Sequence, residues 1–149
     1  MEKWFNENVN SEWVSLRARI MHMLQNEAEL EEIVKLVGMD ALSAPDRLVL
    51  EAARSIREDF LHQDAFHEID TYTSLEKQYL MMKLVLEFFE LSSEALKKGA
   101  DIDDIAAMPS RERIGRFKYV HQDNIEKEYD DIIAALKAEL SQSIPKEEM

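Results

Sequence analysis

Apolar residues recur through most of this chain at spacings of three and four, which is the pattern of amphipathic helices. The longest such stretch, 75–98, predicts a buried helix at the centre of a bundle. Its apolar stripe consists of Leu75, Tyr79, Met82, Val85, Leu86, Phe89 and Leu96. A second stretch, about 45–61, has charged residues on its remaining faces, so it predicts a helix with one buried side. That side carries Leu48, Val49, Ala52, Ala53, Ile56 and Phe60.

The residues on either side of Gly38 predict a helical hairpin. The first arm covers about 11–37, and its apolar stripe ends with Leu30, Ile33, Val34 and Val37. The spacing changes near Asn26, which leaves one continuous helix and a broken helix as alternatives. Gly38 is expected to end this arm in a left-handed conformation, while Ser43 can cap the second arm and Pro45 suits its first turn. The chain therefore reverses between Gly38 and Pro45.

Helix signals in the last third of the chain predict further, mostly shorter helices. Gly99 is expected to end the 75–98 helix, Asp101 can cap the next one, and Pro109 with Ser110 can begin another. The predicted helices cover 102–107, 111–118 and 122–142. The residues between Phe60 and Ser74 have no consistent period and predict an ordered loop, and 143–149 is expected to fray.

Composition supports an all-α fold in a single domain. The chain has 149 residues, of which 46% are hydrophobic, and only three glycines and three prolines interrupt its helical patterns. Residues 1–9 read as an irregular lead-in. No apolar stretch is long enough and uncharged enough to cross a bilayer, so direct membrane insertion is not expected.

Charge and cysteine usage narrow the function classes. The formal net charge is -13, and a uniformly acidic surface repels nucleic acid and anionic lipid. Partners with cationic or mixed-charge surfaces fit it better. The absence of cysteine excludes disulfides, thiolate metal sites and a cysteine nucleophile.

Particular runs of this sequence resemble a known family. The run from Gly38 to Asp46 (GMDALSAPD), with the later run REDFLHQDAF that ends at Phe66, is similar to the C-terminal helical domain of the catalytic A subunit of archaeal-type (A/V-type) rotary ATP synthases. The stretch 108–118 (MPSRERIGRFK) resembles the archaeal type more than the eukaryotic V-type. The resemblance covers Trp4 to about Tyr119, whereas the tail after Val120 resembles no family that we recognise.

The resemblance implies a chain that works as part of a larger subunit. The parent subunit would bind ATP or ADP with Mg²⁺ and contact B subunits and central-stalk subunits, in the cytoplasm and peripheral to the membrane. Residues 1–9 would then lead in from a missing nucleotide-binding domain. A phosphate-binding P-loop needs several closely spaced glycines, and this chain has glycines only at 38, 99 and 115. We therefore expect no ATP hydrolysis and no cofactor for the chain by itself.

Phe60 and Phe66 are the candidate ligand contacts. In the family that this chain resembles, aromatic residues at the matching positions pack against the adenine ring. Stacking of a base on an aromatic ring contributes about 1–3 kcal/mol. The alternative is that both phenylalanines are core anchors.

The hairpin tip is the candidate partner contact. The resemblance implies that Met39, Asp40, Leu42, Ser43 and Asp46 meet the rotating central stalk. The more distant F-type loop is strongly acidic, whereas this loop keeps only Asp40 and Asp46 as charges. A mainly apolar contact through Met39 and Leu42 is therefore expected, and the alternative is a solvated turn.

Other chemical motifs in the chain are weak. Asp59 with His62, and Asp64 with His67, imitate the carboxylate–histidine spacing of di-iron helix bundles. Such sites take ligands from several facing helices, and these copies lie five residues apart, so no metal site is expected. The basic cluster of Arg111, Arg113, Arg116 and Lys118 is more typical of intramolecular ion pairs or a subunit contact than of nucleic-acid binding.

Three functions remain from different classes. The leading one is a coupling module of a rotary ATPase catalytic subunit, whose hairpin moves against the stalk. The second is a free-standing acidic helical adaptor that binds another protein. The third is a small helical enzyme or metal protein, for which the sequence offers no convergent set of polar residues.

Overall fold

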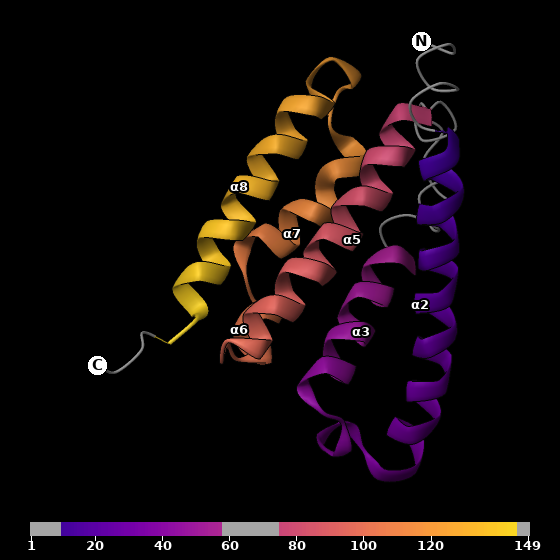
Figure 1. Cartoon of the computed structure of the whole chain (residues 1–149), viewed down its shortest axis with the longest axis vertical. Coiled ribbons are helices and arrows are strands. Elements are labelled where there is room, and N and C mark those ends of the chain that lie inside the picture. Colours follow the sequence, from indigo (N-terminus) through magenta and orange to yellow (C-terminus); the bar gives the residue numbers. More distant parts are fainter. Residues whose placement is uncertain (1–9, 58–74, 146–149) are drawn as a thin grey trace.

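The fold described here is that of a computed structural model, which describes residues 10–57 and 75–145. Helices account for most of this part of the chain, and it contains no strand (Figure 1). The helices are α2 (Asn10–Val37), α3 (Ala44–Ser55), α5 (Leu75–Lys97), α6 (Ile102–Ala106), α7 (Pro109–Arg116) and α8 (Ile125–Ser143). Short 3₁₀ turns lie between them: η2 (Met39–Ala41), η5 (Phe117–Tyr119) and η6 (Gln122–Asn124). The predicted all-α class is confirmed.

The predicted helical hairpin is present as α2 and α3, which run side by side in opposite directions (Figure 1). Helix α2 continues without interruption through Asn26, which decides between the two alternatives that the sequence left open. The second arm begins at Ala44, where the Ser43 hydroxyl accepts the backbone N–H of Asp46 at 3.3 Å. The α-helix ends at Ser55 and continues into a π-helical turn at residues 56–57. The remainder of the predicted arm, 58–61, lies outside the described residues.

Gly38 ends α2, but not in the left-handed helical conformation expected from the sequence. Its φ is 91° and its ψ is 162°, a region that is essentially restricted to glycine. The Gly38 N–H still donates to the Val34 carbonyl at 2.8 Å, so the last helical hydrogen bond is kept. The backbone then turns sharply into η2 rather than closing over the end of the helix.

The predicted central helix is confirmed as α5, which lies between the hairpin and α8 in Figure 1. It packs against α2 and α3 on one side and against α8 on the other. The core around α5 is shielded from solvent. Phe88 on α5, Phe117 in η5 and Ile132 on α8 are all 0% exposed. Full burial of such a side chain contributes about 1.5–3 kcal/mol. We call α5, α6, α7 and α8 the body, as distinct from the hairpin of α2 and α3.

Capping residues fix the shorter elements of the body. The Asp101 carboxylate accepts the N–H of Asp103 at 2.7 Å, so the predicted cap of α6 is confirmed. Helix α7 starts at Pro109, where the sequence predicted that Pro109 and Ser110 begin a helix, and η5 replaces its last predicted turn. Helix α8 starts at Ile125 rather than 122, because the residues from Gln122 to Asn124 form the 3₁₀ turn η6. In the described part of the chain, no helix combines the length and apolar character that crossing a bilayer requires.

Candidate functional site

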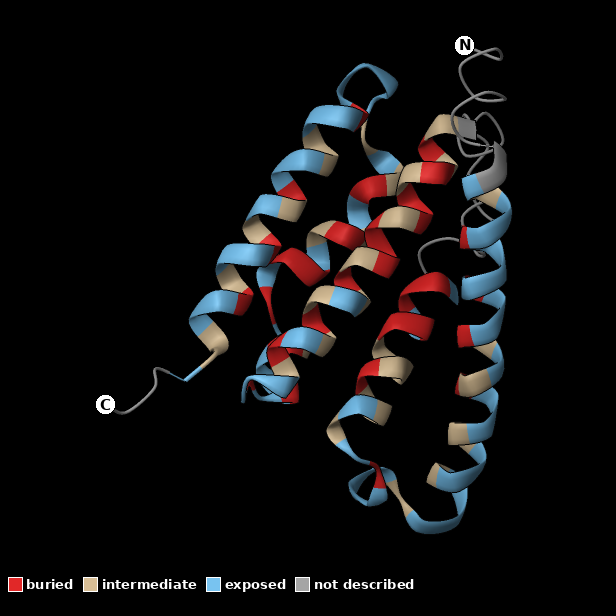
Figure 2. Cartoon of the chain, viewed as in Figure 1, coloured by how far each residue is buried: buried red, intermediate tan, exposed pale blue. Residues whose placement is uncertain are grey.

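The end of the hairpin projects beyond the body. In Figure 1 the lower end of α2, with η2, extends past the ends of α5 and α8. In the described part of the chain, Figure 1 shows α3 and η2 beside this end of α2, and much of its surface is exposed (Figure 2). Helix α3 starts at Ala44, near this end, and lies along one side of α2 only (Figure 1).

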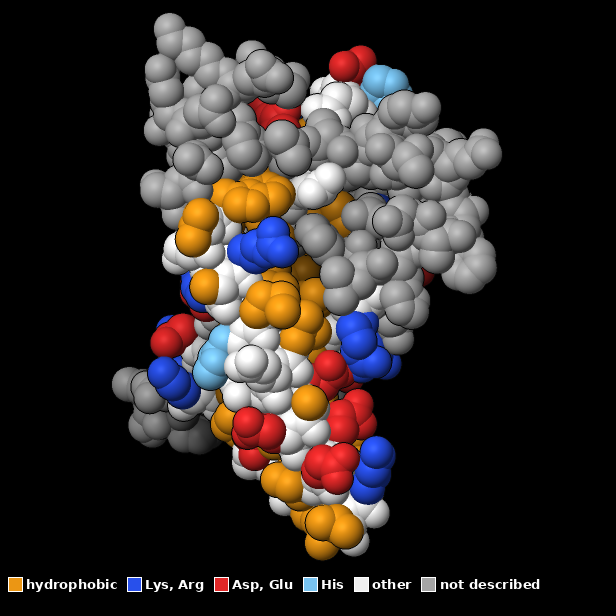
Figure 3. Space-filling model, turned by 90° about the vertical axis from the view of Figure 1, so that its right-hand side faces the viewer, with side chains coloured by type: hydrophobic (Ala, Val, Ile, Leu, Met, Phe, Trp, Pro, Cys, Tyr) orange, Lys and Arg blue, Asp and Glu red, His pale blue; other side chains and the backbone are white. Residues whose placement is uncertain are grey.

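Large apolar side chains are exposed at this end. Leu36 is 82% exposed, Val37 64%, Met39 46% and Ile33 42%. We call these residues the tip patch, and Figure 3 shows hydrophobic side chains at the lower extremity of the molecule. The sequence placed Ile33 and Val37 on the apolar stripe of the first arm. The structure leaves this end of the stripe exposed, because the body ends before it reaches this part of α2.

The predicted stalk-contact residues divide into exposed and covered ones. Met39, Asp40 and Ser43 are exposed, whereas Leu42 is buried at 9% exposure and Asp46 is intermediate. Leu42 is therefore covered by other parts of the chain in this structure. The sequence did not mark Ile33, Leu36 or Val37 as contact residues. Leu36 lies off the apolar stripe of its helix, and this position could have indicated an outward-facing side chain. Contact of these residues with a stalk stays a prediction.

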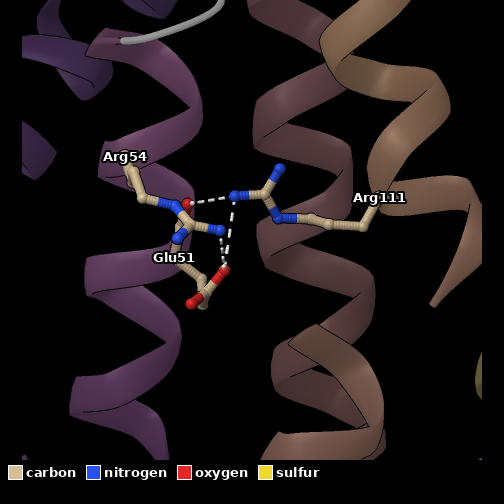
Figure 4. Close-up of polar contacts among 3 residues, drawn as sticks. All are labelled: Glu51, Arg54 and Arg111. Atoms are coloured by element: carbon tan, nitrogen blue, oxygen red, sulfur yellow. Dashed lines mark hydrogen bonds and ion pairs between the residues drawn. The ribbon is translucent and has the colours of Figure 1, made fainter. Parts of the chain in front are cut away.

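A buried arginine connects the hairpin to the body. Arg111 of α7 is 9% exposed, and its Nη2 donates to the backbone carbonyl of Glu51 at 3.0 Å and to the Glu51 carboxylate at 3.3 Å (Figure 4). Arg54 reaches the same carboxylate at 3.2 Å from within α3. The Arg111 guanidinium also lies 5.6 Å from the centre of the buried Phe88 ring. Residues from α3, α5 and α7 thus meet at one cation.

The other members of the basic cluster also have partners within the chain. Arg113 pairs with Glu128 at 3.0 Å, and Arg116 pairs with Glu112 at 3.0 Å. Lys118 lies 5.3 Å from the centre of the Tyr119 ring. The interpretation of the cluster as a set of intramolecular ion pairs is confirmed for its three arginines.

A second polar contact holds the upper half of α2. The Tyr79 hydroxyl on α5 donates to the Glu12 carboxylate on α2. Burial, reinforced by the hydrogen bond and the charge of Glu12, holds the pKa of Tyr79 well above its ordinary value. Lys83 lies 5.3 Å from the centre of the Tyr79 ring and 5.9 Å from that of Tyr129 on α8. Both arms of the hairpin are therefore joined to the body by polar contacts, α2 through Glu12 and α3 through Glu51.

Comparison with known proteins decides the family. The family model described as "C-terminal domain of V and A type ATP synthase" matches residues 2–106. The chain belongs to this family. The hairpin, α5 and α6 lie within the matched range. The predicted resemblance, from Trp4 to about Tyr119, begins within this range and extends beyond its end at residue 106.

Curated relatives of this C-terminal domain carry the name V-type ATP synthase alpha chain. That of Acetivibrio thermocellus is 52% identical over 145 residues, which cover 97% of this chain and 25% of the relative. That of Thermoanaerobacter pseudethanolicus is 56% identical over 134 residues, covering 86% and 23%. That of Clostridioides difficile is 50% identical over 146 residues, covering 98% and 25%. The chain thus spans about a quarter of the length of these relatives.

The similarity extends further than the sequence indicated. We found no resemblance for the tail after Val120, yet matches that cover 97% and 98% of the chain include nearly all of it. Helix α8 is therefore shared with the relatives. Its fully buried Ile132 and Leu136 pack in the same core as α5, so α8 is an integral part of the domain.

Several predicted site residues lie outside the part of the chain that the structure describes. They are the candidate adenine contacts, Phe60 and Phe66, and the weak metal motif formed by Asp59, His62, Asp64 and His67. Over 10–57 and 75–145, no group of three or more histidine, cysteine or acidic side chains is arranged to hold a metal ion.

Proposed function

We propose that this chain is the C-terminal domain of the catalytic A subunit of a proton- or sodium-translocating V/A-type ATP synthase. In that subunit its hairpin would couple ATP synthesis or hydrolysis to rotation of the central stalk. The observation that carries the proposal is the tip patch, an exposed apolar surface at the far end of a hairpin that is fastened to a packed body. Membership of the family favours this function over a free-standing adaptor.

The length of α2 would turn a small tilt of the hairpin into a large displacement of its tip. Helix α2 has 28 residues, so at 1.5 Å per residue it is about 42 Å long. A tilt of about 10° at its upper end would move the tip by about 7 Å, which is the length of more than one helical turn. Nucleotide-driven opening and closing of the parent subunit would supply the tilt, and the tip patch would deliver it to the stalk.

Apolar contact suits a surface that must be engaged and released. Exposed large hydrophobic residues grouped on one surface mark interaction sites in soluble proteins. Within η2, Asp40 is the only charged residue. On the adjoining part of α2, the side chains of Lys35 and Glu32 pair with each other at 3.6 Å. The push on the stalk would therefore be mainly steric, as the sequence suggested.

The remaining assignments of the parent subunit belong to the same proposal. ATP or ADP with Mg²⁺ would bind upstream, with Phe60 and Phe66 against the adenine. The partners would be B subunits and central-stalk subunits, and the complex would hold the subunit in the cytoplasm at the membrane surface. We propose no catalytic residue within this chain.

The test compares two pairs of exposed apolar residues on α2. Leu36→Gln with Val37→Gln removes the centre of the tip patch, and Val14→Gln with Met21→Gln is the matched control on the same helix. The control residues are 64% and 53% exposed, so neither double variant disturbs the core. Binding to purified central-stalk subunits should be lost for the tip variant and kept for the control. Equal binding by both variants would contradict the proposal.

A further inference from the structure

Apolar contacts between α3 and the neighbouring helices do not by themselves fix the position of α3 along those helices. The buried positions of α3 include two alanines, Ala52 and Ala53, which present a smooth surface between Leu48 and the end of the helix. Hydrophobic contact is non-directional, so it tolerates a small slide or tilt of one helix along another. A directed bond is needed to hold the hairpin in one register against the body.

Arg111 makes a bond of this kind. Its Nη2 donates to the backbone carbonyl of Glu51, and a backbone atom in a helix cannot rotate away as a side chain can. The same nitrogen reaches the Glu51 carboxylate, and the buried Phe88 ring lies against the guanidinium from the side of α5. The cation therefore fixes α3 relative to both α5 and α7.

Stability alone does not favour a buried arginine at this place. Removing a guanidinium from water is costly, and ion pairs of this type are often replaced by apolar residues without loss of stability. Nε of Arg111 has no hydrogen-bond partner, nor do the hydroxyls of Ser55, Ser92 and Ser110 on the three helices that meet here. A site that leaves polar atoms unsatisfied is not arranged for maximal stability.

Two other ion pairs between the described parts of the hairpin and the body are more exposed. Arg19 of α2 pairs with Glu90 of α5, and their side chains are 45% and 52% exposed. Arg47 of α3 pairs with Asp103 of α6, and their side chains are 33% and 71% exposed. Water and salt weaken such a pair. The side chain of Arg111 is 10% exposed, so its bonds are protected from both.

We propose that Arg111 is a positioning residue that locks α3 to α7 in a single register, so that the hairpin and the body move as one rigid unit. The lock is a property of this chain, and only its consequence for rotation rests on the proposed function. Without the lock, a tilt of the body would be absorbed at the α3 interface before it reached the tip.

The test measures a distance in the chain itself. Because the sequence contains no cysteine, Asp40→Cys at the tip and Ala134→Cys on α8 provide two unique sites for spin labels. Pulsed electron paramagnetic resonance measures the distance between the two labels. The labelled chain without further substitution should give one narrow distance distribution. Arg111→Met should lose that single distance and give a broad distribution. Glu51→Gln should keep it, since the backbone carbonyl remains as the acceptor.

Controls separate positioning from stability. Ile132→Val lowers stability from a buried position on α8, and it should leave the distribution narrow. Arg111→Lys keeps the charge but lacks the planar fork of the guanidinium, so it should restore the narrow distance only in part. A narrow distribution in Arg111→Met, or one as broad in Ile132→Val, would overturn the proposal.

The outcome in the assembled enzyme distinguishes the two proposals. Arg111→Met should lower the number of ions moved per ATP hydrolysed, whereas Ile132→Val should not. A broad distance distribution with unchanged ion movement would uphold the lock and count against the proposed role of the hairpin. An unchanged distribution would overturn the lock whatever the enzyme does.

Discussion

Gly38 and Gly99 allow the cost of a backbone conformation to be separated from the cost of a contact. Both have positive φ, 91° and 102°, which side chains with a Cβ rarely adopt. A Cβ added to Gly38 would meet nothing within 4 Å, whereas one added to Gly99 would lie 3.2 Å from Cδ of Pro145. Gly99 also ends α5 with a bond from the Ala100 N–H to the Ala95 carbonyl at 3.0 Å, so its conformation is fixed.

The expected magnitudes follow from this geometry. Gly38→Ala carries a conformational penalty of about 1–3 kcal/mol, reduced by about 0.4–1 kcal/mol because alanine also restricts the unfolded chain. The free energy of unfolding should therefore fall by about 1–2 kcal/mol. Gly99→Ala adds a contact cost to its conformational penalty, because the Pro145 ring must shift by a few tenths of an ångström.

Urea unfolding followed by circular dichroism measures both variants, and a double-mutant cycle with Pro145→Ala isolates the contact. Pro145→Ala should recover part of the loss in Gly99→Ala and none of the loss in Gly38→Ala. Gly38→Ala with unchanged or increased stability would refute the assigned backbone conformation. Equal coupling of both glycines to Pro145 would refute the contact.

Substitutions at three further residues test single interactions. Ser92→Ala should raise the free energy of unfolding by up to about 1 kcal/mol, since the buried Ser92 hydroxyl has no partner, and a clear loss would contradict this. Asp101→Ala should lower it by about 1 kcal/mol in the same urea assay, while Asp101→Asn, which keeps a capping oxygen, should be nearly neutral. Burial, with the charges of Glu87 and Asp130, raises the pKa of Tyr129 from 10.0 to about 12. The folded chain therefore keeps a proton that the unfolded chain loses, so stability is full below pH 10.0 and falls as pH rises toward about 12. Tyr129→Phe should flatten that fall in urea unfolding at a series of pH values, and an unchanged slope would contradict the assignment.

The helices and their ends were predictable because their causes are local. The helix at 75–98, the cap at Asp101 and the cap at Ser43 each depend on residues within a few positions, and each is confirmed. For the basic cluster, the sequence favoured ion pairs within the chain or a subunit contact over nucleic-acid binding. It could not name Glu51 as the partner of Arg111, because 60 residues separate the two and only packing brings them together.

The tip patch was not predictable, because its exposure depends on where the neighbouring helices end and not on local sequence. Periodicity marks which residues share a face of a helix, but it does not say where the neighbouring helices end. Ile33 and Val37 continue the stripe of Leu16 and Ile20, which are each 7% exposed, yet the body stops before it reaches them. Leu42 is the converse case, because a residue in a short turn was expected outside and packs inside.

The most direct test of the proposed function is the coupling ratio of the assembled rotary enzyme. Leu36→Gln with Val37→Gln should leave ATP hydrolysis active while the number of ions moved per ATP falls. The control, Val14→Gln with Met21→Gln, should keep the ratio of the unmodified enzyme. An unchanged ratio in the tip variant would contradict the claim that the exposed apolar end of the hairpin drives the stalk.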